Sequence, residues 1–261
     1  MASVVEKLKS AAVKLRLYIP WLYLTRYPFL YALSLLMFLS EYSENKKNRE
    51  YQVSTAIIYV HLAIVITCTT FLIFQYKPRL FSLILAVEQP LANYFLFSVA
   101  AQPPEWQKLH YGGRIVLQFA SFLLMSSGYA NYPARRSIHP KVRHVAVCCH
   151  GMYLVSVTFL VFNEPTLRSA LIHLFGEEHG DVCSTMLGLF IGAAAAFYLS
   201  GHPSKLLSTV TLALLIPYYI VSWNIPYWQR HHKTQYWYCI RNILDDSCFL
   251  SCLSFYMFMF R

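Results

Sequence analysis

Long apolar runs separated by short polar links follow one another along almost the whole chain. The spacing predicts eight membrane-spanning helices, over residues 18–40, 54–74, 80–100, 114–132, 144–162, 182–200, 206–225 and 236–260. Each run has roughly the 20 residues that a helix needs to cross the hydrocarbon core of a bilayer. The first, fourth and last runs fit least well, because each contains or begins with a charged residue. The pattern predicts an all-α integral membrane protein with eight transmembrane helices.

Composition supports the same class. The chain is 57% hydrophobic and only 13% charged, with a mean hydropathy of +0.41, whereas a soluble domain carries about 25% charged residues. No segment outside the runs is long enough to form a soluble domain with its own core. The net charge of 22 − 12 = +10 is typical of basic cytoplasmic loops. We do not expect nucleic-acid binding, because no basic patch with interleaved aromatic residues lies outside the runs.

The distribution of Lys and Arg predicts an orientation. If the N-terminus is inside, the inner segments carry 12 of these residues and the outer loops carry 8, so both termini are predicted to be cytoplasmic. We divide the chain into an amphipathic cytoplasmic segment at 1–17, a four-helix unit at 18–132, a basic cytoplasmic linker at 133–143 and a second four-helix unit at 144–261. Neither the organelle nor the oligomeric state follows from the sequence.

The two four-helix units have features of an internal repeat. A shift of 127 residues places Arg114 on Arg241 and Pro90 on Pro217, because 241 − 114 and 217 − 90 both equal 127. Two units of four helices would run in the same direction, related by an axis along the membrane normal. The alternative is the weak alignment that any two sets of hydrophobic helices show. We therefore predict two parallel four-helix repeats.

Six charged residues in or at the start of the apolar runs form the candidate polar cluster: Arg26, Glu88, Arg114, Arg241, Asp245 and Asp246. An ionisable group at the bilayer centre costs on the order of 2.5 kcal/mol or more unless it meets a partner or water. We expect an Arg26–Glu88 ion pair, because both residues lie at similar depths from the inner surface. The alternatives are a polar pocket or ion path there, or an Arg26 side chain that reaches the headgroups. Pro90 removes one helical hydrogen bond, so the freed carbonyl also needs a partner.

The last run carries the other acidic residues. Arg241 and Asp245 are spaced i, i+4 on one helical face, and Asp246 points about 100° away. Two adjacent carboxylates in a dry helix do not both ionise easily unless arginines or water face them. We predict an electrostatic clasp between the units, made of these residues and Arg114, with a proton or cation site as the alternative. No catalytic residue is predicted, because no nucleophile or metal cluster accompanies the carboxylates.

Other chemistry-bearing residues indicate packing rather than a cofactor or metal. The seven cysteines include no Cys-x-x-Cys pair, so we expect reduced thiols and neither a disulfide frame nor a metal site. Gly188 and Gly192 predict close helix packing, inside the bundle or at a dimer seam. The aromatic residues of Tyr218-Tyr219-Trp223 and Tyr227-Trp228 suit the membrane interface.

Several segments in matching order resemble one known family. They are Leu24-Thr25-Arg26-Tyr27-Pro28-Phe29, Trp106 to Arg114, Phe197 to Gly201, and Tyr227-Trp228 followed by Tyr236-Trp237. Together they resemble the animal transmembrane protein 101 family over nearly the whole chain. The resemblance implies eight spans, no catalytic signature and a link to activation of NF-kappa-B signalling. The chain departs from that family at Glu88, where a neutral amide is expected, and at Asp245, a second acid beside Asp246.

Each four-helix unit also resembles the DoxX-like fold, through a short link between its second and third helices and an aromatic-rich loop before its fourth. Relatives of that fold include quinone-linked subunits, cargo receptors and receptor-assembly chaperones, so it selects no function.

The sequence therefore predicts a non-catalytic membrane scaffold, assembly factor or signalling adaptor that contacts the bilayer and other membrane proteins. The alternative is a carrier of a small ligand, lipid or ion that uses the charges at Arg26/Glu88 and Arg241/Asp246. An enzyme or redox subunit is the third hypothesis. A carrier needs a hydrated cavity of a few hundred Å³ that reaches those charges, whereas a scaffold can have a dry, fully paired core.

Overall fold

The computed structural model describes residues 18–37, 40, 55–99, 105–128, 139–176, 178–201, 203–232 and 236–259. Every regular element in these ranges is an α-helix. The predicted amphipathic segment at 1–17 and most of the predicted linker, residues 133–138, lie outside the described ranges.

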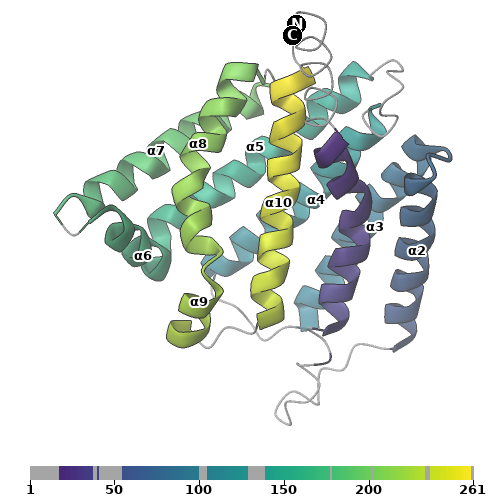
Figure 1. The fold of residues 1–261 in the computed structure, drawn as a ribbon, viewed down its shortest axis with the longest axis horizontal. Helices are drawn as coiled ribbons and strands as arrows, with labels where there is room; N and C mark the ends of the chain where they lie inside the picture. Colours follow the sequence, from purple (N-terminus) through teal and green to yellow (C-terminus); the bar gives the residue numbers. More distant parts are fainter. Residues whose placement is uncertain are drawn as a thin grey trace, which may run out of the picture.

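The helices follow one another in two halves, which we define as residues 18–126 and 140–259 (Figure 1). The first half contains a helix at residues 18–37, drawn in purple, then α2 (Thr55–Ile73), α3 (Pro78–Val99) and α4 (Glu105–Ser126). The second half contains four long helices, α5 (Pro140–Asn163), α7 (Gly180–Leu199), α8 (Lys205–Ser222) and α10 (Tyr236–Met259). It also has two short helices that were not predicted, α6 (Pro165–Phe175) and α9 (Ile225–His232). Each of the eight predicted apolar runs thus contains a helix.

The start of the fourth helix was predicted too late. The apolar run begins at Arg114, but α4 already begins at Glu105. Its first turns are polar, and His110 and Arg114 lie on the same face, four residues apart, where both are buried. Partners elsewhere in the bundle therefore hold this part of the helix, which hydropathy alone does not reveal.

Four helices are long and apolar enough to cross a membrane: Ala56–Ile73, Pro140–Asn163, Gly180–Leu199 and Lys205–Ser222. Charged residues make α3, α4 and α10 less apolar. There are two on α3, including Glu88, and three each on α4 and α10. The large apolar side chains exposed on α2, α7 and α8 suit contact with lipid. The protein is therefore an all-helical, membrane-embedded protein with four apolar candidate spans among the described residues.

The helices at the junction of the two halves pack closely. α4 lies along α5, and a Cβ added at Gly113 would stand 2.0 Å from the Ser156 hydroxyl oxygen of α5. α5 packs in turn on α7, where a Cβ at Gly188 would stand 2.7 Å from the Phe162 ring. Gly192 faces Thr158 of α5. These glycines therefore serve contacts inside the bundle, the first of the two interpretations that the sequence left open.

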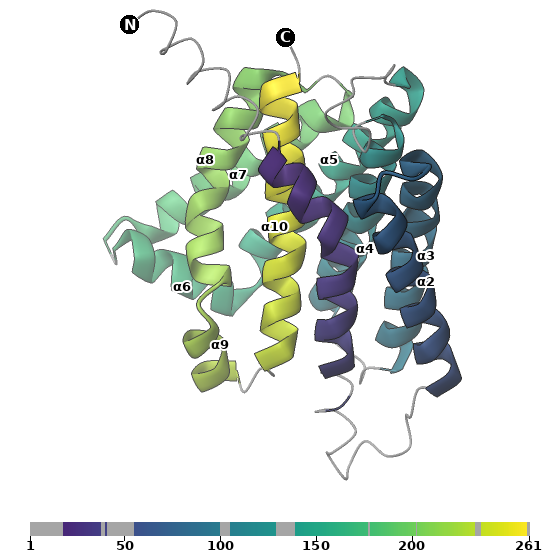
Figure 2. The same ribbon diagram turned by 45° about the vertical axis from the view of Figure 1, so that its right-hand side comes forward.

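The first and last long helices also meet. Figure 2 shows the helix at residues 18–37 crossing α10. The Tyr23 hydroxyl donates a hydrogen bond of 2.9 Å to the Leu244 carbonyl of α10. The last helix of each half thus packs against the first helix of the other half, α4 against α5 and α10 against residues 18–37.

Candidate functional site

Asp245 and Asp246 lie near the middle of α10 and face different neighbours. The Asp245 carboxylate accepts hydrogen bonds from the Tyr27 hydroxyl, at 2.5 Å, and from the Gln118 side-chain amide, at 2.8 Å. The Asp246 carboxylate accepts hydrogen bonds from the Tyr153 hydroxyl, at 2.9 Å, and from the Trp223 indole N–H, at 3.1 Å. Asp245 is therefore bound by donors of the first half and Asp246 by donors of the second.

Arg114 of α4 joins the two carboxylates. Its guanidinium lies 3.4 Å from Asp245 and 3.5 Å from Asp246. It also donates hydrogen bonds to the Asn242 side-chain oxygen, at 2.6 Å, and to His110 Nε2, at 2.7 Å. One cation thus lies between two anions that are adjacent in the sequence, which satisfies the condition under which both can ionise.

Arg241 lies one helical turn before Asp245 on α10 and contacts residues of the first half. Its guanidinium donates hydrogen bonds to the Tyr31 hydroxyl and, at 2.8 Å, to the Asn93 side-chain oxygen. The guanidinium carbon also lies 5.0 Å from the centre of the Tyr31 ring. The Asn93 side-chain N–H donates to Gln118, which donates to Asp245. The structure thus brings Arg114, Arg241, Asp245 and Asp246 into one connected set of hydrogen bonds and ion pairs, which we call the charge network.

The charge network is closed to water. The side chains of Arg114, Asp245 and Asp246 are about 5%, 4% and 0% exposed. A water molecule can therefore touch almost none of their atoms. Two arginines and two aspartates sum to zero formal charge. Removing one partner of such a buried pair costs about 3–5 kcal/mol, because the remaining charge loses its compensation. The charge network therefore stabilises the contact between the two halves.

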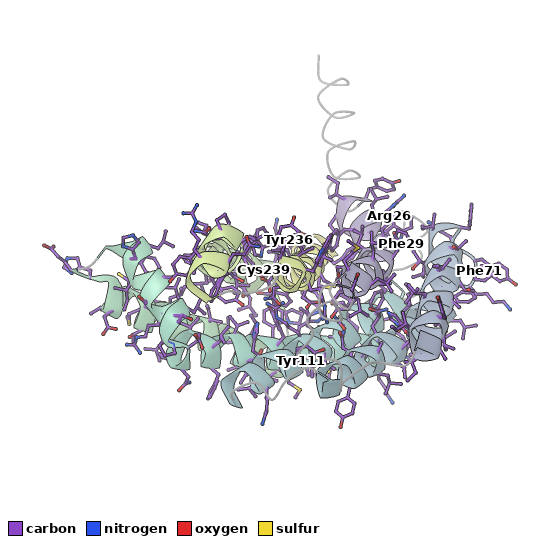
Figure 3. The ribbon with its side chains drawn as sticks, turned by 90° about the horizontal axis from the view of Figure 1, so that it is seen from below. Arg26, Phe29, Phe71, Tyr111, Tyr236 and Cys239 are labelled. Atoms are coloured by element: carbon purple, nitrogen blue, oxygen red, sulfur yellow. The ribbon has the colours of Figure 1, made fainter. Side chains whose placement is uncertain are left out.

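Arg26 and Glu88 do not form the predicted ion pair. Glu88 of α3 pairs instead with His61 Nδ1 of α2 and accepts a hydrogen bond of 2.9 Å from the Gln89 amide. Arg26 is exposed on the outer edge of the bundle, as Figure 3 shows, and donates to the Leu22 carbonyl. The physical reason is helix rotation: residues 18–37 turn their tyrosine face toward the bundle, and Arg26 points about 100° away from Tyr27, out of that contact.

Sequence reasoning missed the uncharged members of the site. The network depends on Tyr27, Tyr31, Asn93, Gln118 and Tyr153, each of which is buried. Helical spacing offered a signal, because Tyr27 and Tyr31, like Arg114 and Gln118, are four residues apart and so share a face. His61, the lone histidine of the otherwise apolar α2, offered a separate signal for the partner of Glu88. These polar residues needed buried partners for the same reason as the charges.

Neither a metal centre nor a disulfide appears among the described residues. No group of three or more His, Cys, Asp or Glu side chains in that part of the chain could hold a metal ion. All seven cysteines are free thiols.

A cavity of about 460 Å³ lies elsewhere, between α6 and the end of α8, and none of the six predicted charged residues lines it. The charge network and this cavity are therefore separate features.

Comparison with models of known protein families identifies the family. The sequence model of the TMEM101 protein family matches residues 9–253, nearly the whole chain. No solved structure matches the chain, and the comparisons do not show the DoxX-like resemblance.

Proposed function

This chain belongs to the TMEM101 protein family, and from that premise we propose that it is a non-catalytic, multi-pass membrane scaffold or signalling adaptor. It acts through contacts with other membrane proteins, and these contacts feed NF-kappa-B activation, as the family resemblance implies. In this proposal all eight long helices cross the membrane and both termini are cytoplasmic. The two halves are parallel repeats.

The dry charge network is the observation that carries the proposal. A carrier must open its charged site to water or substrate, whereas Asp246 is fully buried and bound by Arg114, Tyr153 and Trp223. Opening this site would break these ion pairs and hydrogen bonds together with the contacts between the halves that bury them. A rigid core of this kind suits a protein that presents fixed surfaces to partners.

Reciprocal contacts support the repeat. Arg114 and Arg241 occupy equivalent positions under the 127-residue shift, and each donates hydrogen bonds to residues of the opposite half. Gln118 and Asp245 are also equivalent, because 245 − 118 = 127, and they are hydrogen-bonded to each other. Such an exchange is what a two-fold relation between the halves would produce.

The proposal is tested by purifying the tagged full-length protein from cells in a mild detergent and identifying co-purifying membrane proteins by mass spectrometry. An NF-kappa-B reporter is measured in the same cells. We expect specific membrane partners, and a reporter signal that falls when the chain is depleted. Recovery of only those proteins that an unrelated multi-pass protein also recovers, with an unchanged reporter, would contradict the scaffold function.

A carrier is the second candidate, and the His61–Glu88 pair favours it. This pair lies outside the charge network, the side chains are about 7% and 12% exposed, and His61 Nε2 is buried without a hydrogen-bond partner. Purified protein in liposomes would then conduct protons. Glu88→Gln would reduce the flux, whereas Asp181→Asn, at an exposed ion pair, would not. Flux equal to that of empty liposomes would reject the carrier.

A further inference from the structure

The cavity of about 460 Å³ lies at the end of α8, beside α6, which connects the end of α5 to the start of α7. α5 ends at Asn163, α7 begins at Gly180 and α8 ends at Ser222. Because consecutive spans alternate in direction, these three ends lie at the same face of the membrane. In Figures 1 and 2, α6 lies beside the lower half of α8 and α9 lies at the lower end of α8. The cavity is therefore at the level where the hydrocarbon core meets the headgroups.

One part of the cavity wall is apolar. α6 contributes Ala170 and Leu174, and α8 contributes Ile220 and Val221. Leu174 and Ile220 are among the exposed large apolar side chains of the bundle, so the groove is open along its apolar wall. A chain could pass from the bilayer into this groove without leaving an apolar environment.

The rest of the wall is polar, and the described residues that line it include no carboxylate, lysine or arginine. It consists of Ser169, His173, Asn224 and Tyr227. The nearby cation of α6, Arg168, is paired with Asp181 of α7 at 2.7 Å. The groove thus offers hydrogen bonds rather than net charge to its occupant.

Hydrogen bonds to residues outside the groove fix the α8–α9 side of its wall. The Trp228 indole N–H donates a hydrogen bond of 3.0 Å to the Val221 carbonyl, and the Trp223 indole N–H binds Asp246 of the charge network. Tyr227 and Trp228 pack edge to face, in the manner of aromatic residues at the headgroup level. A wall that is fixed before binding lowers the entropy cost of holding a ligand.

We propose that this groove binds one membrane lipid, with an acyl chain against Ala170, Leu174 and Ile220 and an uncharged or zwitterionic head against His173 and Asn224. The volume lies within the range of about 300–1,000 Å³ that is usual for ligand pockets. Along α8 and α9 the wall changes from apolar, at Ile220 and Val221, to polar, at Asn224 and Tyr227, which matches the two parts of such a molecule. The site is separate from the proposed scaffold function and can exist without it.

The test uses the purified full-length protein in detergent and a phosphatidylcholine probe with a photoreactive diazirine in its acyl chain. Cross-linked peptides are mapped by mass spectrometry, and we expect them to concentrate on α6 and residues 220–227. Ala170→Trp fills the groove and should lower this labelling about ten-fold, because the probe loses most of its apolar burial there. Ala196→Trp, the same change at an exposed position of α7, should leave it unchanged.

A second variant tests the polar end without filling the groove. His173→Ala combined with Asn224→Ala changes two exposed side chains and should weaken labelling several-fold while the fold is retained. Unlabelled phosphatidylcholine should compete with the probe better than phosphatidylserine does. Labelling spread evenly over the lipid-facing helices, or unaffected by both the Ala170 variant and the double variant, would overturn the site and leave only surrounding bilayer lipid. Stronger competition by phosphatidylserine would overturn the assignment of the head.

Discussion

Asp245 and Asp246 are adjacent on α10, yet they accept hydrogen bonds from opposite halves of the chain. Tyr27 and Gln118 bind Asp245, whereas Tyr153 and Trp223 bind Asp246. Consecutive side chains of a helix point about 100° apart, so one helix can serve both sides. The last helix therefore joins the two halves through these adjacent carboxylates, in addition to the contact between α4 and α5.

Asp246→Asn should lower the free energy of unfolding by about 3 kcal/mol or more, because Arg114 would lose a buried counter-charge. Thermal unfolding in detergent, followed by tryptophan fluorescence, measures the effect as a lower Tm. Asp181→Asn is the matched control. Asp181 is about 68% exposed in its pair with Arg168, and exposed pairs contribute about 0–1 kcal/mol. Equal losses of Tm in the two variants would show that the charge network does not stabilise the contact between the halves.

A second experiment measures coupling across the halves. Arg114→Gln and Asp246→Asn should each destabilise the protein. The double variant should be more stable than the sum of the two losses predicts, because neither buried charge is then left without its partner. Strict additivity would mean that the two side chains do not interact in the folded protein.

Glu88→Gln should change the Tm little, because an amide can still hydrogen-bond His61. Glu88→Leu should cost about 1–3 kcal/mol, since it leaves a buried imidazole without its partner. The comparison separates a hydrogen-bonding role of position 88 from a need for its charge. A large loss in Glu88→Gln would show that the charge itself holds α2 to α3.

Gly112 and Gly113 are neighbours on α4 with opposite surroundings. An added Cβ at Gly113 would collide with Ser156, whereas one at Gly112 would meet nothing within 4 Å. Gly113→Ala should therefore destabilise the α4–α5 contact by about 1–3 kcal/mol. Gly112→Ala should stabilise α4 by about 0.5–1 kcal/mol, because alanine loses less backbone freedom in a helix. Unfolding curves of the two variants and the wild type measure both effects. Tm shifts of the same sign in the two variants would contradict this packing.

The proposed topology places residues 178–179, between α6 and α7, outside and both termini inside. A glycosylation sequon introduced after His179 should be modified in cells, whereas sequons in tags on either terminus should not be. Glycan removal followed by a mobility shift reports the outcome. Modification of a terminal tag would contradict the proposed topology of eight crossings.

The sequence by itself predicted much of this protein. Run length and scarcity of charge predict lipid as the solvent and a helix in every apolar run. The cost of burying charge predicts that Arg114, Arg241, Asp245 and Asp246 need partners. These inferences succeed because hydrophobicity and helical periodicity are local properties of the chain.

Only the tertiary structure decided which partners meet. In the folded protein Arg26 is exposed and Glu88 pairs with His61. Tyr27, Asn93 and Gln118 form hydrogen bonds within the charge network. Partner choice depends on how each helix is rotated and which helix lies beside it. Those are set by contacts between residues more than a hundred positions apart, such as Arg114 and Asp245, and no local pattern encodes them.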